Sequence, residues 1–225
     1  MNKVRIKEIF ASIQGEGPYI GYKQIFIRFC NCNLKCNYCD TEFAPDEYFE
    51  EFDAQELADY IKKFDLSTVH SISLTGGEPL LAVDFLKEFL PLTGNVKIYL
   101  ETNATLADRL KEIIDFVDII AADIKIESAS GIPDAYKFHD KFFEIAKQKN
   151  CFAKIVFNKN IKDFEIQSCC ELANKYNLEL VLQPEMTDNA LFMEPDFLEE
   201  ILEKFLKFHP ATRLIPQVHK FLSVR

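Results

Sequence analysis

Short apolar runs alternate with amphipathic segments along most of the chain. The apolar runs predict strands at Ile25–Phe29, Ser71–Leu74, Val96–Leu100, Val117–Ala121, Phe152–Phe157 and Glu179–Leu182. Between most of them lie segments with helical spacing. One is expected to begin at Asp53, because Glu56 three residues on completes a capping-box pattern and apolar residues then share one face as far as Phe64. Another is expected from Pro195 to Phe208, with proline in its first turn.

This alternation predicts a mainly parallel sheet, because consecutive parallel strands are joined by helical crossovers. Strands that are apolar throughout are typical of sheets covered on both faces. The chain has 225 residues, which is short for the eight strand–helix units of a complete barrel. We therefore expect an α/β fold, an incomplete, open parallel (β/α) barrel, as a single domain over residues 1–225.

The acidic charge balance of the chain bears on whether it binds nucleic acid. The chain has 26 Lys and Arg residues against 36 Asp and Glu residues, a formal net charge of −10. Much of the acid lies in residues 46–56 and 194–203, which we interpret as solvated helix faces. No nucleic-acid partner is expected, because phosphate binding needs clustered Lys and Arg. No apolar run is long enough to span a membrane and the N-terminus lacks a signal-peptide core, which predicts a cytoplasmic protein without a membrane partner.

Polar residues and glycines follow the predicted strands where each strand ends. They occupy residues 32–41, 75–79, 101–103, 123–125 and 183–184. In barrels of parallel strands, the functional site is built from the loops at these C-terminal ends. The sequence therefore predicts one site at one mouth of the barrel.

The first of these loops carries a C-x3-C-x2-C motif of Cys32, Cys36 and Cys39. Three thiolates on one tight loop can converge on one face of an iron–sulfur cluster and leave one iron open. Zinc is the rival interpretation, although a structural zinc site normally takes four protein ligands from paired C-x2-C knuckles. The odd total of seven cysteines argues against a disulfide framework. The remaining cysteines are expected to be inert packing residues: Cys30, Cys151, Cys169 and Cys170.

Several single residues allow two interpretations. Arg28 lies inside an apolar run, and a buried lone cation is costly, so we expect a carboxylate partner from the protein or a ligand. Gln14 fits a plain turn residue as well as a binding residue. Glu101 is expected to be an ion-pair partner rather than a base, and Lys125 could be an edge residue with its ammonium in solvent.

The C-x3-C-x2-C spacing, together with Thr75-Gly76-Gly77-Glu78-Pro79, resembles the radical S-adenosylmethionine superfamily. Within that superfamily, the chain is most similar to the 7-carboxy-7-deazaguanine synthase family, almost from end to end. The segments that carry this likeness are Ile13-Gln14-Gly15-Glu16-Gly17, Cys39-Asp40-Thr41, Glu101-Thr102-Asn103 and Gln217-Val218-His219-Lys220. One departure is Ala104, where the family usually has glycine, so a positive φ cannot be assumed there.

The resemblance implies where the cofactors and the substrate bind. A [4Fe–4S] cluster would be held by the cluster loop, residues 30–41, through Cys32, Cys36 and Cys39. S-adenosylmethionine would contact Tyr38, Asp40, Gly77, Asp123, Ile124, Lys125, Gln183, Pro184, Glu185 and Met186, with Glu78 near its ammonium. A magnesium ion would bind Thr41. A pterin substrate would contact Ile13, Gln14, Gly15, Arg28, Thr75, His219 and the carboxylate of Arg225, the last two in a C-terminal tail of residues 213–225.

The implied reaction belongs to queuosine and deazapurine biosynthesis. A radical derived from S-adenosylmethionine takes a hydrogen from 6-carboxy-5,6,7,8-tetrahydropterin, which then contracts to 7-carboxy-7-deazaguanine and releases ammonia. No side chain is expected to be catalytic beyond that cofactor-derived radical. The resemblance also implies a carbon–nitrogen lyase that takes electrons from a flavodoxin or ferredoxin, and a homodimer is our default. A glycyl-radical-enzyme activating protein is the alternative, favoured by the Asp123-Ile124-Lys125 triplet.

Overall fold

The computed structural model describes residues 2–39, 48–133, 135–186 and 190–225. Its strands in this part of the chain form one nine-stranded sheet in the order β3-β1-β2-β4-β5-β6-β7-β8-β9. The strands are β1 (Val4–Ile13), β2 (Lys23–Phe29), β3 (Glu50–Phe52), β4 (Ser71–Gly76), β5 (Lys97–Thr102), β6 (Ile119–Asp123), β7 (Asn150–Phe157), β8 (Glu179–Pro184) and β9 (Thr212–Leu214). Neighbours from β2 to β9 are parallel, whereas β1 pairs antiparallel with β2 and β3.

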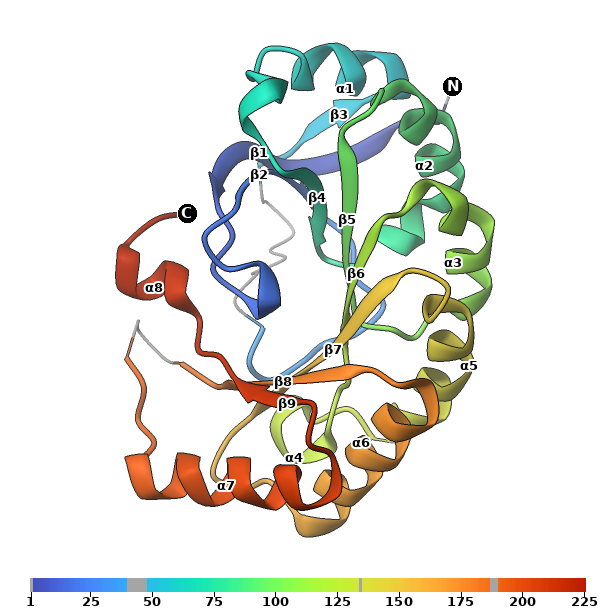
Figure 1. Cartoon of the computed structure of the whole chain (residues 1–225). Helices are drawn as coiled ribbons and strands as arrows, with labels where there is room; N and C mark the ends of the chain where they lie inside the picture. The colour runs from blue at the N-terminus through green and yellow to red at the C-terminus, as the bar shows by residue number, and fades with distance from the viewer. Residues whose placement is uncertain (1, 40–47, 134, 187–189) are drawn as a thin grey trace.

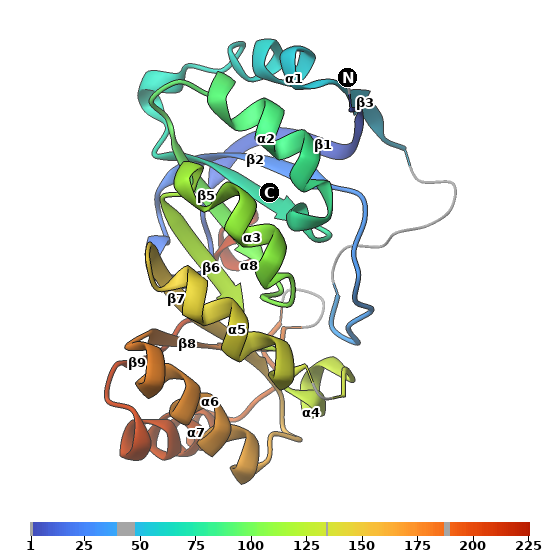
Figure 2. The same cartoon turned by 90° about the vertical axis from the view of Figure 1, so that its right-hand side faces the viewer.

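The sheet is strongly curved, and helices cover its convex side (Figures 1 and 2). The α-helices are α1 (Ala54–Ile61), α2 (Val83–Phe89), α3 (Ala107–Ile113), α4 (Glu127–Ser130), α5 (Tyr136–Ala146), α6 (Asp163–Tyr176), α7 (Pro195–Phe208) and α8 (Val218–Leu222). Short 3-10 helices are η1 (Gly17–Tyr19), η2 (Leu66–Thr68), η3 (Pro79–Ala82), η4 (Leu90–Leu92) and η5 (Ile114–Phe116). Because β3 and β9 remain separate edges, the predicted incomplete, open barrel is confirmed.

The two faces of the sheet carry different cores. The large core lies between the sheet and the outer helices. A small second cluster of Tyr99, Ile119, Ala121, Phe152 and Val181 lies on the concave face. Tyr19 of η1 covers this cluster, with its ring edge-on to Tyr99 at 5.5 Å between centroids. This second cluster fills the concave face near the beginnings of the strands, so that polar side chains lie at the ends of the strands.

All six predicted strands are present, and both clear helix predictions are confirmed. Asp53 and Glu56 make the two reciprocal capping hydrogen bonds, at 2.9 and 2.8 Å. The helix over Pro195–Phe208 has the predicted bounds. The interpretation of residues 46–56 as a helix face was wrong for Glu50–Phe52, which pairs with Val4–Ile6 as strand β3. It is confirmed for residues 54–56, where α1 begins. No helix among the described residues is long and apolar enough to cross a membrane.

Candidate active site

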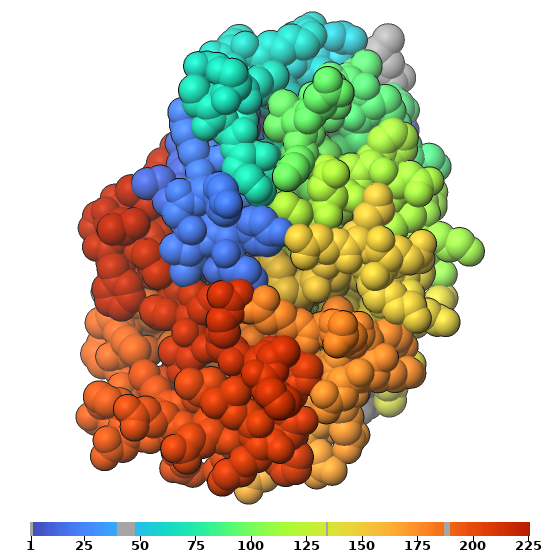
Figure 3. Space-filling view, in the orientation of Figure 1, coloured from blue at the N-terminus to red at the C-terminus, as the bar shows by residue number. Residues whose placement is uncertain are grey.

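A cavity of about 600 Å³ opens at the carboxyl ends of the parallel strands. Most of the predicted site residues line it: Ile13, Gln14, Gly15, Arg28, Cys32, Cys36, Tyr38, Cys39, Thr75, Gly77, Asp123, Lys125, Gln183, Glu185, Met186, His219 and Arg225. These residues come from both ends of the chain, and the N-terminal and C-terminal segments lie against one another at the surface (Figure 3). The curvature of the sheet therefore gathers distant loops into one site.

Some predicted residues do not line this cavity. Ile124 is fully buried in the large core, and its N–H donates to the carbonyl of Lys154. Pro184 ends β8 and is also buried, away from the cavity wall. Asp40 and Thr41 lie outside the described residues, so the predicted magnesium ligand has no described geometry.

The cluster loop follows β2 and is held from two sides. The side chain of Asn103 donates to Asn33 Oδ1 at 2.8 Å and to Cys32 Sγ at 3.9 Å. The N–H of Asn37 donates to the carbonyl of Ser130 at the end of α4. Cys39 is exposed, whereas burial raises the pKa of the Cys32 and Cys36 thiols.

The cavity offers groups suited to an iron–sulfur cluster and a polar cofactor. Three thiols on one loop face the same space, and thiolates are the ligands of such clusters. Across the cavity, Gln183 Oε1 is a buried acceptor without a hydrogen-bond partner among the described residues. A bound molecule with donor groups would satisfy it. Within the described chain, no three His, Cys, Asp or Glu side chains converge as a site for a single metal ion.

The glycine-rich loop after β4 touches the cluster loop backbone to backbone. A Cβ added to Gly77 would lie 1.9 Å from the carbonyl oxygen of Asn31. Gly76 has a φ of +101°, and a Cβ there would lie 2.5 Å from Arg28 Cγ. Glycine is thus required at both positions because other parts of the protein lie too close for a side chain, whether or not a cofactor also approaches this loop.

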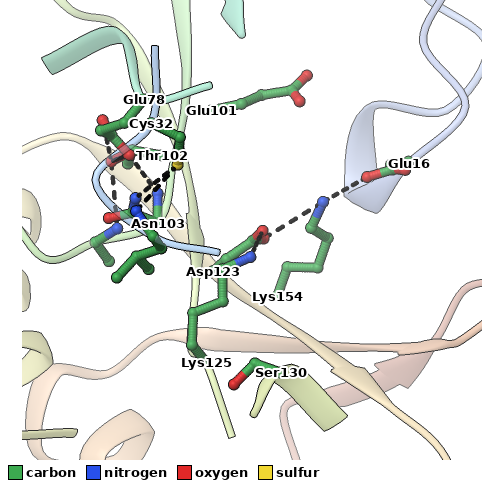
Figure 4. A network of polar contacts seen from close by, with 12 residues as sticks. Glu16, Cys32, Glu78, Glu101, Thr102, Asn103, Asp123, Lys125, Ser130 and Lys154 are labelled. Atoms are coloured by element: carbon green, nitrogen blue, oxygen red, sulfur yellow. Dashed lines mark hydrogen bonds and ion pairs between the residues drawn. The ribbon is translucent and has the colours of Figure 1, made fainter. Parts of the chain in front are cut away.

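Glu78 does not face the cavity, contrary to the expectation that it would lie near the cofactor's ammonium. Its carboxylate is buried and accepts hydrogen bonds from the N–H groups of Leu80 and Asn103 and from the Thr102 hydroxyl (Figure 4). Burial raises the pKa of Glu78 to about 7 against these hydrogen bonds, which lower it. Glu78 therefore joins the glycine-rich loop to the loop after β5.

Arg28 has the carboxylate partner that its position inside an apolar run predicted. Its Nε lies 2.8 Å from Glu8 Oε1 on the neighbouring strand β1. The other oxygen of Glu8 is 2.6 Å from the guanidinium of Arg225, which also lies over the ring of Phe10 at 4.9 Å. The last residue of the chain is thus linked to the same carboxylate as Arg28.

The side chain of Gln14 is buried and joins a hydrogen-bond network, which goes beyond the part of a plain turn residue. Its amide donates to Gln24 and to Glu101, at 2.9 and 3.1 Å. Glu101 also accepts from the hydroxyls of Ser73 and Thr75, at 3.1 and 2.9 Å. Burial raises the pKa of Glu101, opposed by the charge of Lys154. The wall of the cavity is therefore pre-organised by a network of side chains from the loop after β1 and from β2, β4 and β5.

Four alternating charges cross the cavity floor, which we call the charge chain: Glu16, Lys154, Asp123 and Lys125. Lys154 lies between Glu16 and Asp123, and Lys125 Nζ is 2.7 Å from Asp123 Oδ2 (Figure 4). Lys125 is buried and lies over the ring of Tyr38 at 5.2 Å, so it is not a solvent-exposed edge residue.

The C-terminal segment is docked against the N-terminal loop. Val218 N–H donates to the carbonyl of Gly15, and a Cβ at Gly15 would lie 2.5 Å from His219. Lys220 donates to the carbonyl of Met186 at 3.1 Å. His219 is therefore held at the cavity wall by the backbone around it.

Ala104 adopts a positive φ, which its side chain gave no reason to assume. Its φ is +57°, and its N–H donates to Thr102 Oγ1 at 3.2 Å. Its carbonyl accepts from His139 Nδ1, and His139 Nε2 accepts from the N–H of Lys125, both at 3.1 Å. Burial lowers the pKa of His139 to about 4, so the ring is neutral and can make both bonds. The turn after β5 and the Asp123-Ile124-Lys125 segment are thereby joined.

An open parallel barrel whose mouth carries a C-x3-C-x2-C loop beside a glycine-rich loop is the architecture of a radical S-adenosylmethionine enzyme. The model of the Radical SAM superfamily matches residues 26–142. The chain belongs to this superfamily, and it is an enzyme that uses a [4Fe–4S] cluster and S-adenosylmethionine, as predicted.

Within the superfamily, the chain belongs to the 7-carboxy-7-deazaguanine synthase family. It is 37% identical to the 7-carboxy-7-deazaguanine synthase of Geobacter sulfurreducens over 97% of this chain and 96% of the relative. The corresponding enzyme of Methanothermobacter thermautotrophicus is 45% identical over 98% of this chain and 97% of its own length. The crystal structure of QueE from Escherichia coli has the same fold, with a TM-score of 0.63 at 19% identity over 96% of this chain and 95% of that one. The family prediction is confirmed, and none of these comparisons favours the activating-enzyme alternative.

Several residues of the cavity were missed by the sequence analysis. Lys154 of the charge chain and Asn103 are buried, whereas Glu16 is partly exposed; Glu8, which was also missed, is partly exposed and lies outside the cavity wall. A signal existed for Lys154, since a lysine inside the apolar run Phe152–Phe157 needs a partner, as Arg28 does. The contact of Asn103 with Cys32 depends on the tertiary structure.

Proposed function

We propose that this chain converts 6-carboxy-5,6,7,8-tetrahydropterin to 7-carboxy-7-deazaguanine with loss of ammonia, in queuosine or deazapurine biosynthesis. The observation that carries the proposal is a single cavity that is lined by the three cluster cysteines together with Arg28, Gln14 and His219. The names of the relatives agree with this reaction. When bound, the cluster and S-adenosylmethionine would supply the radical that removes a hydrogen from C6 of the pterin.

The residues of this chain would bind and orient the pterin. Arg28, whose Nε is held by Glu8, would pair with the substrate carboxylate through its guanidinium group. Gln14 and Thr75, fixed by Glu101, would present backbone and hydroxyl groups to the ring. His219 would add a contact from the docked tail, together with the carboxylate of Arg225. Fixed partners reduce the freedom that each group loses on binding, which favours a reactive geometry.

Other residues of the same cavity would bind the cluster and S-adenosylmethionine. We propose that Cys32, Cys36 and Cys39 hold the cluster and that S-adenosylmethionine lies between Gly77 and the strand ends of β6 and β8. Its contacts there would include Tyr38, Asp40, Asp123, Ile124, Lys125, Gln183, Pro184, Glu185 and Met186. For Ile124 and Pro184, only backbone contacts are compatible with their buried side chains.

Other parts of the proposal concern partners and location. Thr41 would bind a magnesium ion that acts as a template and stabilises charge on the substrate. A flavodoxin or ferredoxin would supply electrons near the exposed Cys39. We further propose one domain over residues 1–225, a homodimer and a cytoplasmic location.

Anaerobic reconstitution with iron and sulfide tests the proposed function. With S-adenosylmethionine, a reductant and the tetrahydropterin, the wild type should form 5′-deoxyadenosine and 7-carboxy-7-deazaguanine. Cys36→Ala should abolish iron binding and both products. Cys151→Ala is the matched control, because Cys151 lies on β7 outside the cavity wall and should retain activity. A reconstituted wild type that cleaves S-adenosylmethionine and leaves the pterin unchanged would overturn the substrate assignment.

A further inference from the structure

Lys154 lies between the two halves of the proposed site. Its register partner on the neighbouring strand is Asp123, so both side chains leave the same face of the sheet at the same level. The Lys154 ammonium lies 3.3 Å from Asp123 Oδ1 and forms an ion pair with Glu16 (Figure 4). Asp123 belongs to the proposed cofactor residues, and Glu16 directly follows the proposed substrate residues Gln14 and Gly15. One side chain therefore contacts both halves.

The contacts continue at both ends of the charge chain. Gln217 of the C-terminal tail donates to Glu16 Oε1 at 2.8 Å. At the other end, Lys125 holds the second oxygen of Asp123. Each carboxylate thus has a fixed donor on both oxygens, and Asp123 still has lone pairs free to accept a ligand hydroxyl. A shift at one end of the charge chain changes the contacts at the other.

The charge states of these groups are fixed by their surroundings. Burial alone would raise the pKa of Glu16, but the Lys154 charge and hydrogen bonds from Lys154 and Gln217 lower it to about 2. Burial alone would lower the pKa of Lys154, but Asp123, Glu16 and Glu101 raise it well above its usual value. Lys154 therefore remains charged near neutral pH and is a poor proton donor. Its contacts suit it to hold other groups in position.

We infer that Lys154 is a positioning residue that links the cofactor half of the cavity to the substrate half, so that S-adenosylmethionine and the pterin bind cooperatively. The inference rests on the proposed function. A ligand hydroxyl on Asp123 fixes that carboxylate, which restricts Lys154 and, through Glu16, the substrate loop of Gln14 and Gly15. Binding free energies are reciprocal, so each ligand raises the affinity for the other by the same factor.

Titrations of the oxidised holoenzyme measure this coupling, because no turnover occurs without a reductant. The affinity for the tetrahydropterin is compared with and without S-adenosylmethionine. In the wild type, we expect S-adenosylmethionine to raise it at least about fivefold. Lys154→Met should reduce the factor to near one, and Lys154→Arg, which keeps the charge and can contact both carboxylates, should restore part of it. Lys175→Met is the matched control, since it removes an exposed ion pair with Asp140 far from the cavity.

A second variant separates loss of coupling from misfolding of Lys154→Met. Lys154→Met leaves two carboxylates without their ammonium, whereas the double variant with Glu16→Gln removes one of these charges and should also lose the coupling. During turnover, both variants should form more 5′-deoxyadenosine per product than the wild type. Wild-type coupling in both variants, or no coupling in a wild type that binds both ligands, overturns the inference. A wild type that binds S-adenosylmethionine but no pterin instead overturns the proposed function.

Discussion

Gly77→Ala should displace the cluster loop, because the glycine-rich loop contacts it through backbone atoms. The added Cβ would lie 1.9 Å from the carbonyl oxygen of Asn31 and 2.4 Å from its carbonyl carbon. The same oxygen accepts a hydrogen bond of 2.7 Å from the N–H of Glu78. Asn31 directly precedes Cys32, so any movement of its carbonyl is passed to the first cluster cysteine.

The cost of this substitution follows from the contacts. The Asn31 carbonyl has to withdraw to at least 3.0 Å from the new Cβ, and this breaks its bond with Glu78. A buried N–H left without a partner costs about 1–3 kcal/mol. Overpacking in a well-packed region adds about 1–3 kcal/mol. The lower ends of these two ranges add up to about 2 kcal/mol. If half of this cost acts on the cofactor site, the affinity for S-adenosylmethionine falls by roughly fivefold, since about 1.4 kcal/mol corresponds to a factor of ten. A larger share of the cost would lower the affinity further.

The assay compares iron content, S-adenosylmethionine affinity and thermal unfolding of anaerobically prepared protein. Gly94→Ala is the control, because no atom lies within 4 Å of its added Cβ and its φ is +69°. Its cost is backbone strain alone, with no effect on iron or cofactor binding. Wild-type iron content and cofactor affinity in Gly77→Ala would refute the reasoning, since the two loops would then separate without consequence.

Two further predictions concern the tail and a buried carboxyl group. Deleting residues 221–225 should leave the cluster and S-adenosylmethionine binding intact and raise the pterin KM at least about tenfold, as expected for a lost charged contact; unchanged KM in steady-state kinetics would contradict the role of the tail. The pKa of Glu78 is raised to about 7 by burial, so the folded protein binds this proton more tightly than the unfolded chain. Stability should therefore fall as pH rises from 5 to 8, by about 2.5 kcal/mol relative to Glu78→Gln, which does not titrate. If the difference in unfolding free energy between the wild type and Glu78→Gln were the same at pH 5 and at pH 8, this prediction would be wrong.

The parallel strands were predictable because both of their faces are covered, which makes them continuous apolar runs. The missed strands lack this property. β1 (Val4–Ile13) alternates apolar and charged residues and is partly exposed, and β3 and β9 have only three residues each. Short edge strands are defined by their pairing partners rather than by their own composition. The location of the site was predictable for a different reason, since polar loops at the ends of parallel strands have to meet at one mouth.

The positive φ of Ala104 shows where local preference gives way to tertiary structure. A left-handed conformation costs a non-glycine residue roughly 1–2 kcal/mol. Here the hydrogen bonds of its N–H to Thr102 and of its carbonyl to His139 offset that cost, and the methyl group is fully buried. His139 lies 35 positions further along the chain. The sequence of the turn alone therefore could not reveal its conformation.

A charged residue inside an apolar run indicates a buried or half-buried ion pair, and this inference was drawn from the sequence only for Arg28. The same argument that predicted a carboxylate partner for Arg28 applies to Lys154 and Lys125, which also end or interrupt buried strands. In the structure, each of the three cations has a carboxylate partner, and these partners are Glu8, Glu16 and Asp123. A buried ion pair contributes little net stability, while losing one member is costly. The fold alone therefore does not require these pairs. All three cations, with Glu16 and Asp123, line one cavity, as expected if they serve the proposed ligand binding there.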